Sequence, residues 1–151
     1  MAELKERLRA DLNAAMRARD QVRMRTLRLA LTSITNEEVA GASARDLTDD
    51  EVVRVLTREA RKRREAAEAF SAAGRSDQAA AERAEGDDLA GYLPAQLSDD
   101  ELAALVDAAI AETGASGLSG LGQVMKTVTP RIAGRADGAR VAAEVRRRLS
   151  G

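Results

Sequence analysis

The chain has 151 residues with almost balanced charge, 24 Lys and Arg against 25 Asp and Glu, and one Tyr and one Phe as its only aromatic residues. It contains neither Cys nor His, which excludes thiol nucleophiles, disulfides, histidine bases and Cys/His metal sites within the chain. A composition rich in Ala, Leu, Glu and Arg favours helix over strand, so we predict an all-α fold.

Membrane and export signals are not found in the sequence. No apolar run approaches the roughly 18 to 20 residues that a membrane span needs. The first residues, Met-Ala-Glu-Leu-Lys-Glu, also lack the apolar core of a signal peptide. We therefore expect a cytoplasmic protein.

The first 93 residues show the three- and four-residue apolar spacing of about four helices. Leu4, Leu8 and Leu12 follow this spacing, and so do Leu27 and Leu31 in the next segment. The predicted helices cover residues 3–19, about 20–41, 48–73 and 76–92.

Two helix starts carry the same capping signature. Thr48 and Ser98 are each followed three residues later by Glu, which is the pattern of a capping box. Pro94 disfavours helical geometry in the residue before it. We place a domain boundary there, which predicts an N-terminal helical domain over residues 1–93 and a smaller C-terminal domain over residues 94–151.

The C-terminal domain is predicted to be a three-helix bundle. Its helices are expected over residues 98–113, 117–129 and 138–149, with Pro130 ending the second and Asp137 capping the third. The turn between them, Gly134-Arg135-Ala136-Asp137-Gly138, places a guanidinium beside free backbone N–H groups at a helix start, where an anion such as phosphate can bind. An ordinary connection between two helices shows the same pattern, with Gly at a helix end and Asp at a helix start.

Charge is unevenly distributed within this domain. Residues 98–116 hold five acidic side chains and no basic one, whereas residues 117–151 hold seven basic and two acidic side chains. The basic segment could form a face for a phosphate-bearing partner. Attraction between the acidic and the basic helix explains the pattern equally well.

A second basic cluster is Arg61-Lys62-Arg63-Arg64 on the third helix. Four consecutive residues point around the whole helix, and Arg61 can pair with Glu65 one turn later. A solvated, salt-bridged face and a nucleic-acid site are both open for this cluster. Acidic pairs such as Asp99-Asp100 lie mostly in first helical turns, where the dipole favours acids, so we assign no catalytic residue, cofactor or metal ligand.

Several segments resemble the GatB/YqeY family, and in particular its free-standing YqeY-like members. The resemblance rests on Leu27–Leu29, Asn36–Glu38, Arg63–Glu65, Gly74–Arg75, Tyr92–Ser98, Ile110–Ser116, Gly122–Lys126, Pro130 and Gly134–Gly138. It implies two all-helical domains, the second similar to the tail of the B subunit of the glutamine-dependent aspartyl/glutamyl-tRNA amidotransferase. In that enzyme the tail contacts tRNA. The resemblance does not extend to the two catalytic parts of the enzyme, the cradle domain for ATP-dependent activation and the amidase subunit.

The resemblance implies a non-catalytic module of translation, with tRNA as partner and a protein of the translation or tRNA-aminoacylation machinery as a second one. The residues expected to meet phosphate are Lys126, Arg131, Gly134, Arg135, Gly138 and Arg140. An adaptor for an enzyme subunit, steered by Arg61–Arg64, is the alternative. A third reading is the family-level activity, a carbon-nitrogen ligase with glutamine as amido donor, which would need a Ser or Thr nucleophile beside Lys126.

Overall fold

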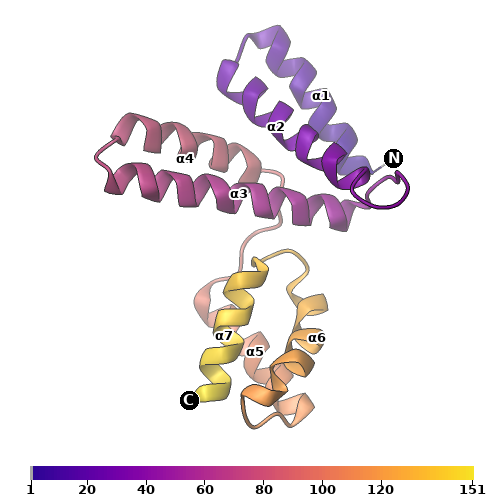
Figure 1. Ribbon diagram of the computed structural model, residues 1–151, viewed down its shortest axis with the longest axis vertical. Coiled ribbons are helices and arrows are strands. Elements are labelled where there is room, and N and C mark those ends of the chain that lie inside the picture. Colours follow the sequence, from indigo (N-terminus) through magenta and orange to yellow (C-terminus); the bar gives the residue numbers. More distant parts are fainter. Residues whose placement is uncertain (1) are drawn as a thin grey trace. The chain divides into compact units, whose positions relative to one another are not determined.

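The computed structural model describes residues 2–151, and within that range it is helical without strands (Figure 1). The predicted all-α fold is confirmed. The chain divides into two compact units, residues 1–93 and residues 94–151. None of the helices in the described range combines the length and apolar character needed to cross a membrane. The α-helices are α1 (Glu3–Ala18), α2 (Gln21–Glu38), α3 (Asp49–Ala72), α4 (Ser76–Ala90), α5 (Asp99–Thr113), α6 (Leu121–Ile132) and α7 (Gly138–Ser150), and a 3-10 turn, η1, spans Leu118–Gly120.

Both predicted capping boxes are present. The Thr48 hydroxyl accepts from the Glu51 N–H at 3.2 Å, and the Glu51 carboxylate accepts from the Thr48 N–H at 3.3 Å. Ser98 and Glu101 make the same pair of bonds, both at 3.1 Å. These reciprocal bonds satisfy backbone donors that a helix start leaves without partners. They set the first residues of α3 and α5.

The first unit consists of two helical hairpins, α1 with α2 and α3 with α4 (Figure 1). Their apolar faces meet in one cluster, because leucine and isoleucine recur at helical spacing on each of them. The largest fully buried side chains in this core are Leu8, Leu27, Ile34, Leu56 and Leu89.

A buried ion pair joins the two ends of the first hairpin. The Lys5 ammonium lies 2.7 Å and 2.9 Å from the two carboxylate oxygens of Glu38, and both side chains are almost fully buried. The Leu47 N–H adds a third bond to the same carboxylate at 3.4 Å. The hydrogen bond from Lys5 is the main reason that the pKa of Glu38 lies below its ordinary 4.5. Removing either partner would leave an uncompensated charge in the core.

The end of the first unit is held by a polar network around Tyr92. The phenol donates to Asp11 of α1 and accepts from Arg23 of α2 at 2.9 Å. The guanidinium of Arg7 lies 4.8 Å from the ring centroid, and Arg23 also pairs with Asp88 of α4 at 3.6 Å. Burial, with the bond to Asp11, raises the pKa of Tyr92 to about 12. The network therefore fastens α1, α2 and α4 to the last residue before the Leu93-Pro94 boundary.

The second unit packs α5, α6 and α7 around a small core of branched side chains. Valine dominates this core, and its members recur every three or four residues on their helices. Its fully buried residues include Val106, Val124, Val128 and Val145.

The prediction that Pro130 ends the sixth helix is wrong. Helix α6 continues through Pro130 to Ile132, and it begins at Leu121 after the short turn η1 instead of at residue 117. Ile132 is 3% exposed in the core, and Ala133 closes the helix in the left-handed conformation, with φ 51°. Because Pro130 lies in the last turn, the helix loses one hydrogen bond there, and burial of Ile132 offsets that loss.

Candidate nucleic-acid interface

The turn between α6 and α7 is built from a left-handed pair and a capping carboxylate. Ala133 and Gly134 have φ of 51° and 79°, which reverses the chain directly after α6. Asp137 caps α7 as predicted, its carboxylate accepting from the Arg140 N–H at 2.9 Å. A negative charge of the protein itself therefore already lies at the start of α7, where an external anion was expected to bind.

Two of the sequence segments that carry the family resemblance meet at this turn. The Leu97 N–H donates to the Arg135 carbonyl at 2.8 Å. The Gln96 amide donates to the Gly134 carbonyl at 3.4 Å. Gly138, at the first position of α7, has open space where a side chain would begin. The glycine at 134 therefore serves the turn, whereas Gly138 leaves its backbone open to a ligand.

The structure gives Arg135 partners in its own backbone. Its guanidinium donates to the carbonyls of Ile132 and Arg131, each at 3.4 Å, at the C-terminal end of α6. Cationic donors stabilise a helix at this end, because its last carbonyls lack intrahelical partners. The residue predicted to hold phosphate thus also caps α6.

Three ion pairs connect the basic segment with the acidic helix α5. Arg140 lies 2.8 Å from Asp99, and Arg148 lies 3.2 Å from Asp107. The third pair joins Arg131 and Glu112 at 2.5 Å. Of the two explanations for the uneven charge, attraction between the segments is the one that these contacts realise. Seven basic and seven acidic side chains leave the second unit without net charge.

These cross-links remain solvent-accessible. The Asp99 side chain is 99% exposed, and the Arg131 and Glu112 side chains are about half exposed. Exposed ion pairs contribute about 0 to 1 kcal/mol, so the guanidiniums can exchange one anionic partner for another at little cost. Arg131 and Arg140 can therefore exchange their carboxylate partners for another anion.

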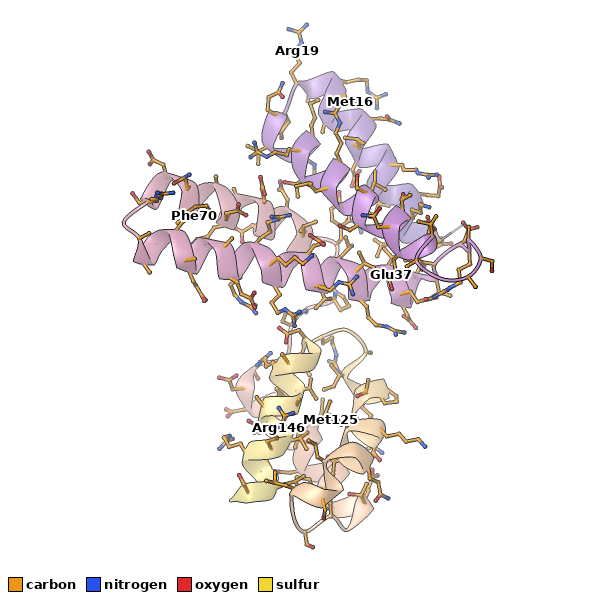
Figure 2. All side chains as sticks on the ribbon, viewed as in Figure 1. Met16, Arg19, Glu37, Phe70, Met125 and Arg146 are labelled. Atoms are coloured by element: carbon orange, nitrogen blue, oxygen red, sulfur yellow. The ribbon has the colours of Figure 1, made fainter. Side chains whose placement is uncertain are left out.

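Lys126 differs from the four arginines of this unit that pair with carboxylates, which are Arg131, Arg140, Arg147 and Arg148. It lies on the exposed side of α6 and forms no ion pair with any residue in the described range 2–151. Arg146 is also exposed on α7, without an ion pair in that range (Figure 2). From sequence, the run Arg146–Arg148 is explained by the helix dipole, which favours cations near a helix C-terminus, so Arg146 was not assigned to the site. In the structure Arg147 and Arg148 both pair with Glu144.

The second basic cluster is mostly absorbed by neighbouring carboxylates. Arg61 pairs with Glu65 as its spacing predicts, and Lys62 pairs with Glu59. Arg63 faces α4, where its guanidinium lies 3.6 Å from Glu85 and also contacts Glu59 and Glu82. This cluster forms a salt-bridged face.

The hydroxyl groups near Lys126 are engaged by the helix backbone. Thr127 donates to the Gln123 carbonyl at 3.0 Å, and Thr129 donates to the Met125 carbonyl at 2.6 Å. An activated nucleophile instead needs its proton directed toward a base. Among residues 2–151 there is also no group of three or more carboxylates that could hold a metal ion.

These features define a two-unit all-α protein. Its second unit has a hydrogen-bonded turn with Arg131 before it and Arg140 after it, and both arginines are held by solvent-exposed ion pairs. The model of the family described as Yqey-like protein matches residues 5–149, so the chain belongs to that family. A search of curated proteins found no match.

Proposed function

We propose that this protein is a non-catalytic tRNA-binding module, and that its second unit contacts RNA phosphates. The observation that carries the proposal is the exposed Lys126, which has no carboxylate partner in the described range. Arg131 and Arg140 add two guanidiniums whose present partners are exposed. The resemblance of this unit to a tail that contacts tRNA supports the choice of RNA.

Phosphate binding by this unit has to compete with its own carboxylates. Each of Arg131 and Arg140 must leave a carboxylate before it meets a phosphate oxygen. The exchange is nearly balanced, because a charge-assisted hydrogen bond is lost and another is formed. Lys126 has no competing carboxylate in the part of the chain that the structure describes, so we expect it to make the largest single contribution to phosphate binding.

The adaptor alternative draws no support from Arg61–Arg64. Arg61, Lys62 and Arg63 pair with carboxylates of the same unit, and Arg63 turns toward α4. The paired carboxylates largely cancel the positive potential that Arg61–Arg64 would otherwise create at the protein surface.

The proposal is tested by measuring tRNA binding to the full-length protein over a series of salt concentrations. Each neutralised phosphate adds roughly 0.7 to 0.9 to the slope of log K against log salt. We expect Lys126→Ala to lower the slope by roughly 0.7 to 0.9, the contribution of one phosphate, and to weaken tRNA binding. Arg83→Ala, at an exposed position of α4, is the matched control and should leave the slope unchanged. Binding without salt dependence, or equal loss in both variants, would contradict the proposal.

A further inference from the structure

Three exposed apolar side chains lie on the first helical hairpin. Met16, Val22 and Leu29 are 39%, 40% and 40% exposed, although large apolar side chains are elsewhere mostly buried. Val22 and Leu29 are seven residues apart on α2, so they lie on one face, about 10.5 Å apart along the helix axis. Met16, at the end of α1, is joined to α2 because the Arg28 guanidinium donates to its sulfur at 3.5 Å.

The same hairpin carries an excess of positive charge. Residues 12–36 contain five arginines and one acidic residue, Asp20, whose carboxylate is engaged as the cap of α2. Arg23 and Arg25 pair with carboxylates of other helices in the unit. The other three form no ion pair with any residue that the structure describes, namely Arg17, Arg19 and Arg28.

Met16, Arg17 and Arg19 lie where α1 ends and α2 begins, and the other three side chains, Val22, Arg28 and Leu29, lie along α2. Figure 2 shows Met16 near the end of the hairpin and Arg19 projecting from it, away from the rest of the first unit. Arg19 takes a left-handed conformation, with φ 56°, in the short connection between α1 and α2. We define the hairpin surface as Met16, Arg17, Arg19, Val22, Arg28 and Leu29.

We propose that the hairpin surface binds an acidic amphipathic helix of a partner protein. Leucines spaced seven residues apart on such a helix would repeat the separation of Val22 and Leu29 and cover them. Glu or Asp residues beside that apolar stripe would meet Arg17, Arg19 and Arg28, which pair with no carboxylate among residues 2–151. Arginine and methionine are both enriched at protein interfaces.

An RNA partner fits this surface less well. Phosphate groups would use Arg17 and Arg19 but would leave Val22, Leu29 and Met16 in water. Single-stranded bases need aromatic faces on which to stack, and the hairpin from residue 3 to residue 38 contains no Phe, Tyr or Trp. The combination of cations with aliphatic side chains therefore favours a protein helix.

The probe is a fluorescein-labelled peptide of three heptads, with Leu at the first and fourth positions and Glu flanking them. Its affinity for the full-length protein is measured by fluorescence anisotropy. We expect a control peptide with Ser in place of Leu to bind at least tenfold more weakly, and a peptide with Lys in place of Glu to show no binding. A 20-nucleotide single-stranded RNA is measured in parallel.

Two double variants separate the charge and the apolar contributions. Arg17→Glu with Arg19→Glu should weaken peptide binding about tenfold at low salt and less at 0.5 M salt, because screening removes the attraction. Val22→Ser with Leu29→Ser should weaken it about tenfold at both salt concentrations. Arg75→Glu with Arg83→Glu changes the net charge equally at exposed positions of the other hairpin and should change affinity less than twofold.

Circular dichroism must show that every variant keeps the helical content of the parent protein. Equal losses for the two charge variants would overturn the proposal, because binding would then depend on net charge alone. Failure of the acidic Leu peptide to bind better than its Ser version would overturn it as well. If the Arg17 and Arg19 substitutions weaken RNA binding while leaving peptide binding intact, the surface is a nucleic-acid site instead.

Discussion

The N–H of Leu97 donates a 2.8 Å hydrogen bond to the carbonyl of Arg135, across 38 residues of sequence. This bond ties the segment that enters α5 to the turn that joins α6 and α7. The adjacent bond from Gln96 to Gly134 repeats the connection. The turn is therefore a structural closure of the second unit as well as a candidate interface, and substitutions in it must be assessed for stability and binding separately.

Asp137→Ala is expected to destabilise the second unit by about 0.5 to 2 kcal/mol, since the carboxylate caps α7 through the Arg140 N–H. Urea unfolding and hydrogen exchange of the α7 amides measure the loss. Asp137→Asn preserves an acceptor and serves as the control, with a smaller expected loss. Equal stability of the Ala variant and the parent protein would show that the cap is energetically silent.

Arg135→Ala is expected to lower the unfolding free energy by about 0.5 to 1.5 kcal/mol, because two carbonyls at the end of α6 lose a donor. From sequence, Arg135 is expected only to meet phosphate, which predicts an effect on ligand binding. Urea unfolding and tRNA affinity per folded molecule distinguish the two contributions. A variant with normal binding per folded molecule would remove Arg135 from the interface.

Glu112→Gln is expected to increase tRNA affinity several-fold at low salt, since it releases Arg131 and removes a nearby negative charge. The effect should fade at 0.5 M salt, and unfolding should change by less than about 0.5 kcal/mol, as for other exposed pairs. Asp100→Asn, at an exposed position outside these pairs, is the control for net charge. An equal gain from both substitutions would mean that net charge, not the release of Arg131, governs binding.

Lys5→Met is expected to destabilise the first unit by about 3 to 5 kcal/mol, because Glu38 would remain buried without its counter-charge. Adding Glu38→Leu should recover part of the loss. A double variant less stable than the single one would contradict this account. Thermal and urea unfolding provide the measurement.

The same pair gives the first unit an acid sensitivity of defined sign. The folded-state pKa of Glu38 is lowered from 4.5, so the contribution of the pair is complete above pH 4.5 and is lost as pH falls through the lower pKa. A Glu38→Gln variant should be less stable near neutrality and should lose less further stability in that acidic window. An unchanged pH profile of unfolding would rule out this role.

Gly120→Ala is expected to destabilise the second unit by about 1 to 3 kcal/mol, because the added Cβ would lie 2.7 Å from the Cβ of Ala115. Gly122→Ala, two residues later in α6, meets nothing within 4 Å and should stabilise the helix by about 0.5 to 1 kcal/mol. Opposite signs in urea unfolding are thus expected for the same chemical change. Similar effects at both positions would contradict the close approach at Gly120.

Sequence patterns predicted the helices well where local chemistry decides their ends. Thr48, Ser98 and Asp137 each act as the cap that their neighbours imply. The prediction that Pro130 ends the helix is wrong. The hydrogen bond lost at Pro130 destabilises the helix less than burial of Ile132 in the core stabilises it. Burial depends on the tertiary structure, which no local pattern contains.

The candidate site was less accessible to prediction. The sequence revealed an acidic and a basic segment, but only their packing decides that Arg140 meets Asp99 and that Arg148 meets Asp107. Arg135 was chosen for its place beside glycines, and its bonds to the α6 carbonyls depend on the path of the turn. Which arginines of the first hairpin lack an ion pair within residues 2–151 likewise depends on packing, since Arg23 and Arg25 pair with carboxylates of other helices.

If the second unit binds RNA as we propose, its ion pairs between α5 and the basic segment would favour polyanions over small anions. A free phosphate or nucleotide would displace a single carboxylate and gain little, since one exposed pair replaces another. A polyanion that reaches Arg131 and Arg140 together replaces both carboxylates in one event, with the second exchange made intramolecular. The carboxylates of α5 would then compete successfully with dilute small anions for these arginines, whereas a folded nucleic acid would displace them.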